Sequence, residues 1–158
     1  MVDGDTGELP QDELTGAVGP PDTAVMRLLR DQFRRDEPLV ESAAFDSVLQ
    51  PRELVVTFSD GIGPATYCQL SITWYQSGAY RFHHVDSESV NWRFDHHPNP
   101  HSPPKHFHEP PDGASHTAVE SCIEVEKPRV VARAVHKLWR RAYEAGTHEL
   151  INTGQNPP

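Results

Sequence analysis

The chain has 158 residues, a length that suits a single domain of ordinary size. Only 36% of its residues are hydrophobic, and no apolar run approaches the ~18–20 residues that a membrane-spanning helix requires, so we expect no membrane span. The first residues contain neither a basic nor an apolar stretch, which argues against a signal peptide and predicts a cytoplasmic location.

The charged residues are unusual in their balance. The formal net charge is −9, and all but three of the 14 basic residues are arginine. Many carboxylates, little lysine and modest hydrophobicity suggest the hypothesis of halophilic adaptation to a high-salt cytoplasm. At ~1 M salt the Debye length is about 3 Å, so the negative net charge would not exclude nucleic acid as a partner. Phosphate would be held by close arginine hydrogen bonds.

The two ends of the chain differ in composition from its middle. Residues 1–21 carry five carboxylates and no basic residue, so we expect a disordered acidic tail. A single α+β domain is expected over residues 22–145. We expect a frayed C-terminal tail over residues 146–158.

Two amphipathic helices are predicted, one near each end of the domain. The first covers residues 22–36 and is ended by Pro38, and the last starts near Pro128 and runs to about Glu144, before Gly146. Apolar residues at helical spacing are expected to face the core. These are Val25, Leu28, Leu29 and Phe33 in the first helix, and Val131, Ala134, Val135, Leu138 and Ala142 in the last.

The residues between the helices predict antiparallel strands. Apolar and polar residues alternate over 52–58, 67–75, 80–85 and 90–95, with short turns between these segments, and a fifth short strand is expected around 118–125. The predicted fold is therefore α+β: an antiparallel β-meander of four to five strands, with an N-terminal and a C-terminal helix packed on one face. Aromatic residues at strand spacing are expected in the core, namely Trp74, Tyr80, Trp92 and Phe94.

Histidines gather in one proline-rich segment that reads RFDHHPNPHSPPKHFHEPPDG. Histidine exchanges a proton near neutral pH and is also a common metal ligand, so an active site is expected here. The spacing of His106 and His108 puts both imidazoles on one side of an extended segment. His97 lies at the end of the preceding strand, close to Asp95 in sequence.

Acid–base chemistry without a metal is one interpretation of this segment. Two histidines can cleave RNA when one takes the 2′-OH proton, the other protonates the leaving oxygen and a cation stabilises the charged intermediate. His106 and His108 would exchange the protons, with His97 as a further candidate and Asp95 orienting a histidine. This reaction needs no cofactor. The cation would come from Arg81, Arg93 or Lys105.

Two other interpretations stay open. His97, His106 and His108 could instead be three ligands of a zinc ion that keeps an open position for water. The segment could also be a solvated histidine-rich loop with only incidental affinity for metals.

Basic residues form a continuous face on the last helix, where Arg129, Arg133, His136 and Arg140 are spaced at multiples of a helical turn. Such a face could bind RNA phosphates, with Arg133 and Arg140 as candidate contacts, or an acidic partner protein. It could equally be the solvated side of an amphipathic helix.

The segment YRFHHVDSESVNWRFDHHPNPHSPPKHFH resembles the TumE-type toxins of prokaryotic toxin–antitoxin systems. Two strands of this kind, joined by a short acidic turn and followed by a loop with closely spaced histidines, are features of that family. The matching residues are Tyr80, Phe82, His83, Asp86, Trp92, Arg93, Phe94, Asp95, His97, Pro98, His106 and His108. The resemblance implies a growth-inhibiting toxin that acts on RNA or translation and is neutralised by a cognate antitoxin, a small DNA-binding protein.

The favoured hypothesis is therefore a TumE-like toxin that acts as a metal-independent endoribonuclease or as an RNA-binding translation inhibitor. A non-enzymatic module that binds a partner protein is the first alternative. A zinc-binding hydrolase built on the histidine-rich segment is the second.

Overall fold

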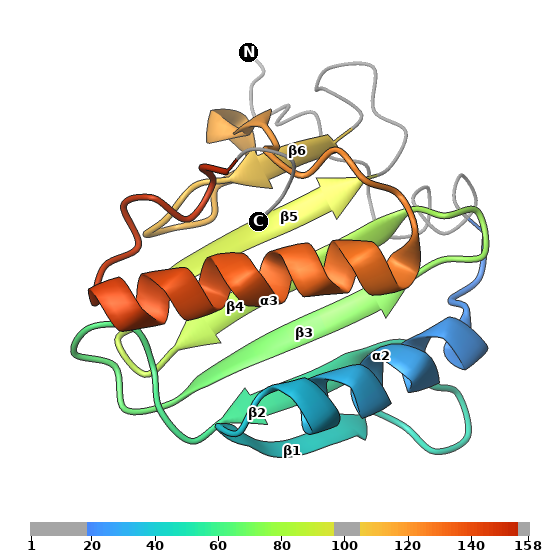
Figure 1. Ribbon diagram of the computed structural model, residues 1–158. Coiled ribbons are helices and arrows are strands. Elements are labelled where there is room, and N and C mark those ends of the chain that lie inside the picture. The colour runs from blue at the N-terminus through green and yellow to red at the C-terminus, as the bar shows by residue number, and fades with distance from the viewer. Residues whose placement is uncertain (1–18, 97–104, 155–158) are drawn as a thin grey trace.

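The computed structural model describes residues 19–96 and 105–154 of the chain. Within these residues it contains two helices of more than one turn and a seven-stranded antiparallel sheet whose strands follow one another in chain order (Figure 1). The helices are α2 (Thr23–Asp36) and α3 (Pro128–Ala145), and a short 3-10 turn, η1, covers Ser115–Thr117. The strands are β1 (Val40–Phe45), β2 (Leu54–Phe58), β3 (Cys68–Trp74), β4 (Tyr80–Asp86), β5 (Asn91–His96), β6 (Lys105–His108) and β7 (Val119–Glu120).

The predicted α+β fold with an antiparallel meander is confirmed, but the predicted number of strands is too low. The two additional strands are β1 and β6. β1 is an edge strand with a single fully buried residue, Ala43, so its sequence lacks the alternation that marks a half-buried strand. β6 has only four residues and lies within the histidine-rich segment that the sequence suggested to be a loop.

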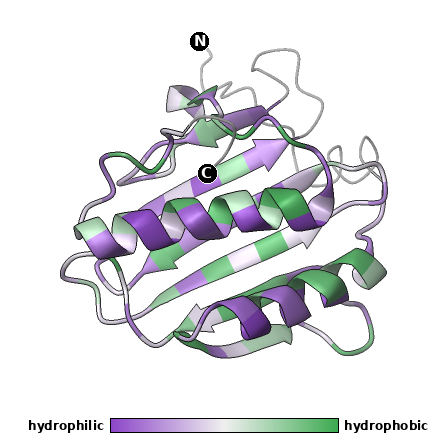
Figure 2. Ribbon diagram, viewed as in Figure 1, coloured by the Kyte–Doolittle hydropathy of each residue, from purple (hydrophilic) through white to green (hydrophobic). Residues whose placement is uncertain are grey.

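Capping residues set the helix boundaries close to the predicted ones. The Asp22 side chain accepts a hydrogen bond from the backbone N–H of Val25 at 3.1 Å, which satisfies one of the free donors of the first turn. α3 ends at Gly146, whose φ of +74° is a left-handed conformation that glycine adopts without steric cost. Figure 2 shows hydrophilic and hydrophobic residues alternating along both helices, as amphipathic helices require.

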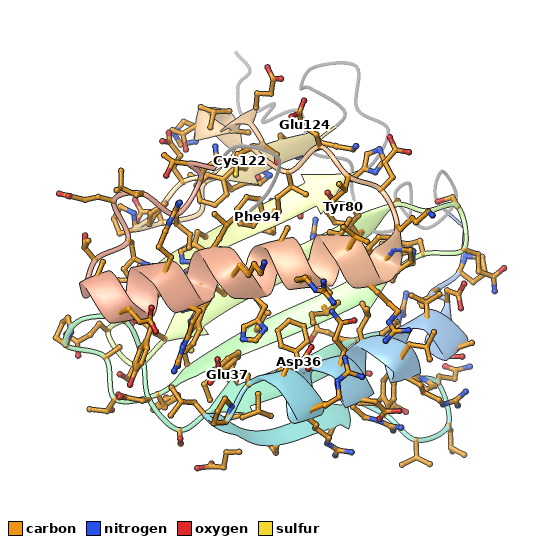
Figure 3. The ribbon with its side chains drawn as sticks, in the orientation of Figure 1. Asp36, Glu37, Tyr80, Phe94, Cys122 and Glu124 are labelled. Atoms are coloured by element: carbon orange, nitrogen blue, oxygen red, sulfur yellow. The ribbon has the colours of Figure 1, made fainter. Side chains whose placement is uncertain are left out.

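Both helices lie in front of the sheet in Figure 1. α3 contacts the sheet through Trp139, whose ring centroid is 4.5 Å from that of Phe58 on β2. The two helices are joined by Glu37, labelled in Figure 3, which accepts a hydrogen bond from His136 Nε2 at 2.9 Å and lies 3.4 Å from Arg140 Nη1. The buried apolar residues of the two helices and of the strands form one cluster, so the hydrophobic core lies between the helices and the sheet.

The predicted core residues are confirmed on α3 and on the strands, but not throughout α2. All five predicted residues of α3 are buried, as are Trp74, Tyr80, Trp92 and Phe94. On α2, Leu29 and Phe33 are buried as predicted, whereas Leu28 is 53% exposed and Met26 takes its place in the core.

The C-terminal segment packs against the domain as far as the structure describes it. Ile151 is 2% exposed and belongs to the core, and Trp92 Nε1 donates a hydrogen bond to His148 Nδ1 at 3.1 Å. The fraying expected from residue 146 onward does not hold for these two residues.

The acidic residues 1–18 lie outside the described part of the chain. None of the described helices is both long and apolar enough to cross a membrane.

Candidate functional site

The strand register brings the predicted polar residues together on one face of the sheet. Arg81 of β4 is paired with Asp95 of β5, which is itself paired with His106 of β6. Two residue pairs further along, Arg93 of β5 is paired with His108 of β6. Side chains alternate between the two faces of a strand, and the intervening Phe82, Phe94 and Phe107 belong to the hydrophobic core. The polar side chains therefore point away from that core.

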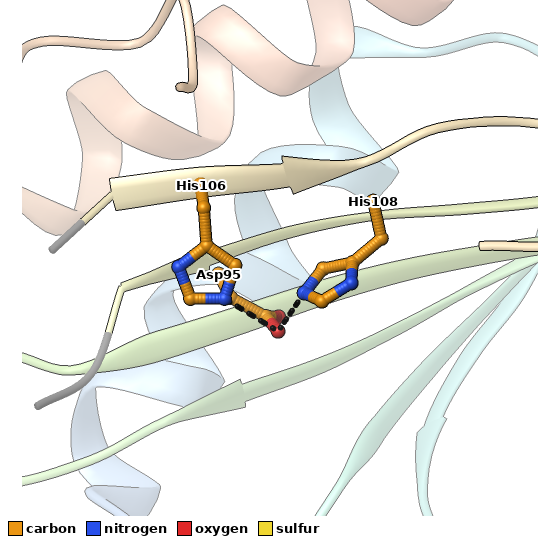
Figure 4. Close-up of side chains that lie close together, drawn as sticks. All are labelled: Asp95, His106 and His108. Carbon is orange, nitrogen blue, oxygen red and sulfur yellow. Dashed lines mark ion pairs between the residues drawn. The ribbon is translucent and has the colours of Figure 1, made fainter. Parts of the chain in front are cut away.

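Asp95 is the centre of this group, which we call the Asp95 cluster: Arg81, Arg93, Asp95, His106 and His108. The Oδ2 atom of Asp95 lies 3.2 Å from His108 Nε2 and 3.7 Å from His106 Nε2 (Figure 4). Arg93 Nε donates a hydrogen bond to the same oxygen at 2.8 Å, and Arg81 Nε lies 3.4 Å from Oδ1. The centroids of the two imidazole rings are 4.8 Å apart.

The cluster is buried at its centre and partly exposed at its arginines. The side chain of Asp95 is 0% exposed and those of His106 and His108 are each 1% exposed, whereas Arg93 and Arg81 are 12% and 25% exposed. Removing charges from water costs several kcal/mol per ion unless they are paired, so a buried ionic group is weak evidence of stabilisation. Such groups occur frequently at functional sites.

The protonation state of His108 determines which neighbour its Nε2 atom can bond. Nδ1 lies 3.2 Å from the Ala114 carbonyl and can donate a hydrogen bond to it. If His108 is neutral with its proton on Nδ1, Nε2 can accept a hydrogen bond from Arg93 Nη2, 3.1 Å away. If His108 is protonated, Nε2 donates to Asp95 instead. Nε2 of this imidazole thus has a hydrogen-bond partner in either form.

His83 borders the cluster on the same face, paired with Arg93 across the strands. Burial is the main reason that its pKa is lowered, and a hydrogen bond between its Nε2 and Asn91 Oδ1, at 2.7 Å, opposes the shift. His83 is therefore neutral at pH 7.

Three of the predicted phosphate-binding residues lie elsewhere. Lys105 alternates with His106 on β6, and its Nζ is paired with Glu126 at 3.1 Å. Arg133 and Arg140 are on α3, which covers the other face of the sheet, and Arg140 is engaged with Glu37. His97 lies outside the described residues.

The structure also adds groups that the sequence did not suggest. Ser115 Oγ lies 3.4 Å from Arg93 Nη2, and the carbonyl of Ala114 faces His108. Both belong to the turn between β6 and β7, whose approach to the cluster has no local sequence signal. The pairing of β5 with β6 and of β6 with β7 brings this turn back over the site, as does a backbone hydrogen bond from Asn91 N–H to the Pro111 carbonyl.

Three residues of the cluster also have the arrangement of a metal-binding site. One ligand atom each from Asp95, His106 and His108 can be chosen so that all three lie within 4.8 Å of one another. Two imidazoles and a carboxylate are a donor set that zinc accepts. Arg93, however, contacts both Asp95 Oδ2 and His108 Nε2, so its positive charge lies where a metal ion would be bound. A metal ion bound here would therefore have to displace the Arg93 guanidinium from these two atoms.

Comparison with known proteins identifies the family. The family model described as Toxin TumE matches residues 27–144, a range that includes most of both helices and every residue of the Asp95 cluster. No curated protein and no solved structure gives a significant match. The chain belongs to the TumE toxin family and is thus a toxin of a toxin–antitoxin system.

Proposed function

We propose that this toxin inhibits growth by acting on RNA and that the Asp95 cluster is its working site, without a metal ion. The observation that carries the proposal is the convergence of two imidazoles on one buried carboxylate, with two arginines on the same carboxylate. Two groups that exchange protons and a positive charge for phosphate are what cleavage by the 2′-OH requires.

The geometry suggests a role for each residue. His108 serves as the acid, because its protonated form has an acceptor at each nitrogen, the Ala114 carbonyl and Asp95. His106 serves as the base. Asp95 positions both rings, and Arg93 binds the phosphate because its guanidinium contacts the acid and is partly exposed.

Access to the two imidazoles is part of the proposal. Phosphate meets Arg81 and Arg93 first, since these are the partly exposed members of the cluster. His106 and His108 are each 1% exposed, so the residues above them must move before a ribose can reach either ring. We therefore expect this opening step to limit the rate at which the toxin acts. Cleavage of RNA should be slow, or, if the toxin only binds RNA, the tight complex should form slowly.

Incubation of the purified toxin with total RNA, with and without EDTA, tests the proposal. The double variant His106→Gln/His108→Gln keeps side chains of similar size and polarity but cannot exchange protons near neutral pH. We expect cleavage that survives EDTA, persists in the control His116→Ala and is lost in the double variant. His116 is the matched control because it is an exposed histidine on η1, outside the cluster.

A zinc hydrolase is the second candidate, supported by the distances among Asp95, His106 and His108. In that case elemental analysis of tag-free protein would find about one zinc per chain, and EDTA would abolish the activity. Asp95→Asn would then lower the zinc content, whereas the metal-free site would contain no stoichiometric zinc before or after the substitution.

A non-enzymatic role is supported by the basic face of α3. Arg129, Arg133 and Lys137 are exposed there, and none of them makes an ion pair within 4 Å with another described residue. These three residues could bind RNA phosphates, or acidic side chains of the antitoxin, which we expect to be a small DNA-binding protein. RNA binding without cleavage that is lost in Arg133→Ala/Lys137→Ala would favour this alternative.

A further inference from the structure

A cavity of about 570 Å³ lies apart from the Asp95 cluster, where the C-terminal segment leaves α3. In Figure 1 this segment is red and runs from the end of α3 toward β6. The cavity is lined by the loop after β2, the turn after β4, the turn after β6 and residues of the segment 146–153. Its volume is within the range of pockets that bind small molecules or single side chains of a partner protein.

The walls of this cavity are apolar and its charges are all negative. Apolar side chains come from Ile62, Val90, Phe107 and Ile151, together with three prolines. The charged residues that line it are Asp86, Glu88, Glu109 and Glu149, and no arginine or lysine is among the lining residues. A ligand with an aliphatic part and a positive charge is complementary to such walls.

Asp86 gives the cavity a buried carboxylate that pairs with no lysine or arginine of the described part of the chain. Its side chain is 1% exposed, and Oδ1 accepts hydrogen bonds from the backbone N–H groups of Glu88 and Val90 at 2.8 and 3.0 Å. Oδ2 has no hydrogen-bond partner among residues 19–96 and 105–154. The nearest candidate is His148 Nε2 at 3.6 Å, which is beyond hydrogen-bond distance.

His148 does not supply the missing charge. Its Nδ1 accepts a hydrogen bond from Trp92 Nε1, and burial lowers its pKa more than the neighbouring Asp86 raises it. The imidazole is thus neutral at pH 7. A buried carboxylate that lacks a cation destabilises the isolated protein, and binding of a positively charged group would remove this cost.

We propose that this cavity is a docking site for the antitoxin and receives a lysine or arginine side chain of that protein. The cationic end donates a hydrogen bond to Asp86 Oδ2, and the aliphatic stem packs against Phe107 and Ile151. Glu88 and Glu149 at the exposed rim attract further basic residues of the same segment. The proposal follows from charge complementarity and rests on the family's antitoxin partner, not on the proposed action on RNA.

Calorimetric titration with a small cation tests the pocket directly. The probes are N-butylguanidinium and its neutral isostere butylurea, added to the purified full-length toxin. We expect butylguanidinium to bind at least about tenfold more tightly, since a charge-assisted hydrogen bond to a buried carboxylate contributes that much. Asp86→Asn should remove this preference. Equal binding of the two probes, or no binding of either, would overturn the proposal.

Titration with the purified antitoxin tests the occupant. Glu88→Lys/Glu149→Lys reverses two exposed rim charges and should weaken the complex at least about tenfold at low salt. Glu41→Lys/Glu124→Lys is the matched control, because it changes the net charge equally at exposed positions outside the cavity. Unchanged affinity in the rim variant, or equal loss in the control, would rule out docking here. Both variants should remain fully toxic without antitoxin, whether or not the toxin cleaves RNA.

Discussion

Asp95 is the residue on which the candidate site depends. Its carboxylate is fully buried and neutralised by Arg93 and Arg81, and it contacts both imidazoles. Removing one partner of a buried ion pair typically destabilises a protein by about 3–5 kcal/mol, because the other charge is left without compensation.

We therefore predict that Asp95→Asn lowers the free energy of unfolding by about 3 kcal/mol and abolishes growth inhibition. Urea unfolding monitored by tryptophan fluorescence measures the first effect. Asp112→Asn, at an exposed position, should change stability by less than about 0.5 kcal/mol. An Asp95 variant as stable as the control would show that the carboxylate does not hold the two arginines in place.

His84 predicts a dependence of stability on pH. The imidazole is 0% exposed and stacks on Trp92, with ring centroids 4.5 Å apart and an interplanar angle of 4°. Burial, followed by the proximity of His148 and His83, lowers its pKa to about 3, although the Val90 carbonyl opposes the shift. In the unfolded chain the pKa is about 6.5, so between pH 3 and 6.5 the unfolded state binds the extra proton.

The free energy of unfolding should therefore be highest above about pH 6.5 and should fall as the pH is lowered toward 3. One buried histidine of this kind contributes a loss of about 2 kcal/mol between pH 7 and pH 5. His83 and His148, whose pKa values are also lowered, add to the loss in the same direction. Urea unfolding at the two pH values measures it. His84→Phe retains a ring against Trp92 and should reduce the loss, whereas an unchanged loss would assign it to other groups.

At the scale of elements, the sequence predicts strands from their alternation of apolar and polar residues. It does not predict which strands pair with each other. The apolar alternation of β2 to β5 and the stripe of α3 predict elements that the structure confirms. The spacing of His106 and His108 correctly predicts two imidazoles on one side of an extended segment. That this segment is a strand bonded to β5, however, depends on a pairing that no local pattern encodes.

The C-terminal segment shows the same limitation. Its sequence is polar apart from Leu150 and Ile151, so it has no periodicity from which packing could be predicted. In the structure Ile151 is 2% exposed and Leu150 is 60% exposed. The position of this segment depends on α3 ending at Gly146 and on the cavity that the segment closes, both of which are tertiary features.

These neighbouring residues provide a matched pair of variants. Ile151→Ala should lower the free energy of unfolding by about 2–4 kcal/mol, because it leaves a void in the core. Leu150→Ala should change it by less than about 0.5 kcal/mol. Chemical denaturation of both variants measures the difference. Equal, small effects would mean that the segment is not part of the cooperative fold.

At the scale of the whole molecule, charge is segregated. Of the 14 basic residues, four lie on α2 and five on α3, so the helical layer is basic in a protein whose net charge is −9. The Asp95 cluster lies on the other face of the sheet, and the acidic cavity lies where α3 ends. The three binding sites that we propose, for phosphate, for a basic segment and for an acidic partner, would thus lie on separate surfaces.

The excess of carboxylates predicts that the stability of the folded protein depends on the salt concentration. Repulsion among them destabilises the folded state at low ionic strength and is screened at ~1 M salt, where the Debye length is about 3 Å. We expect the urea midpoint to rise between 0.1 M and 2 M KCl (roughly the range over which screening becomes complete). A midpoint independent of KCl would contradict the hypothesis of adaptation to high salt.

Growth inhibition by cluster variants tests the central claim most directly. Expression of the toxin without antitoxin should arrest growth, as should expression of the exposed control His116→Ala. His106→Gln/His108→Gln, accumulated to the same level and folded by circular dichroism, should allow growth at the rate of uninduced cells. If this folded double variant arrested growth as fully as the wild-type protein, the Asp95 cluster would not be the working site of the toxin.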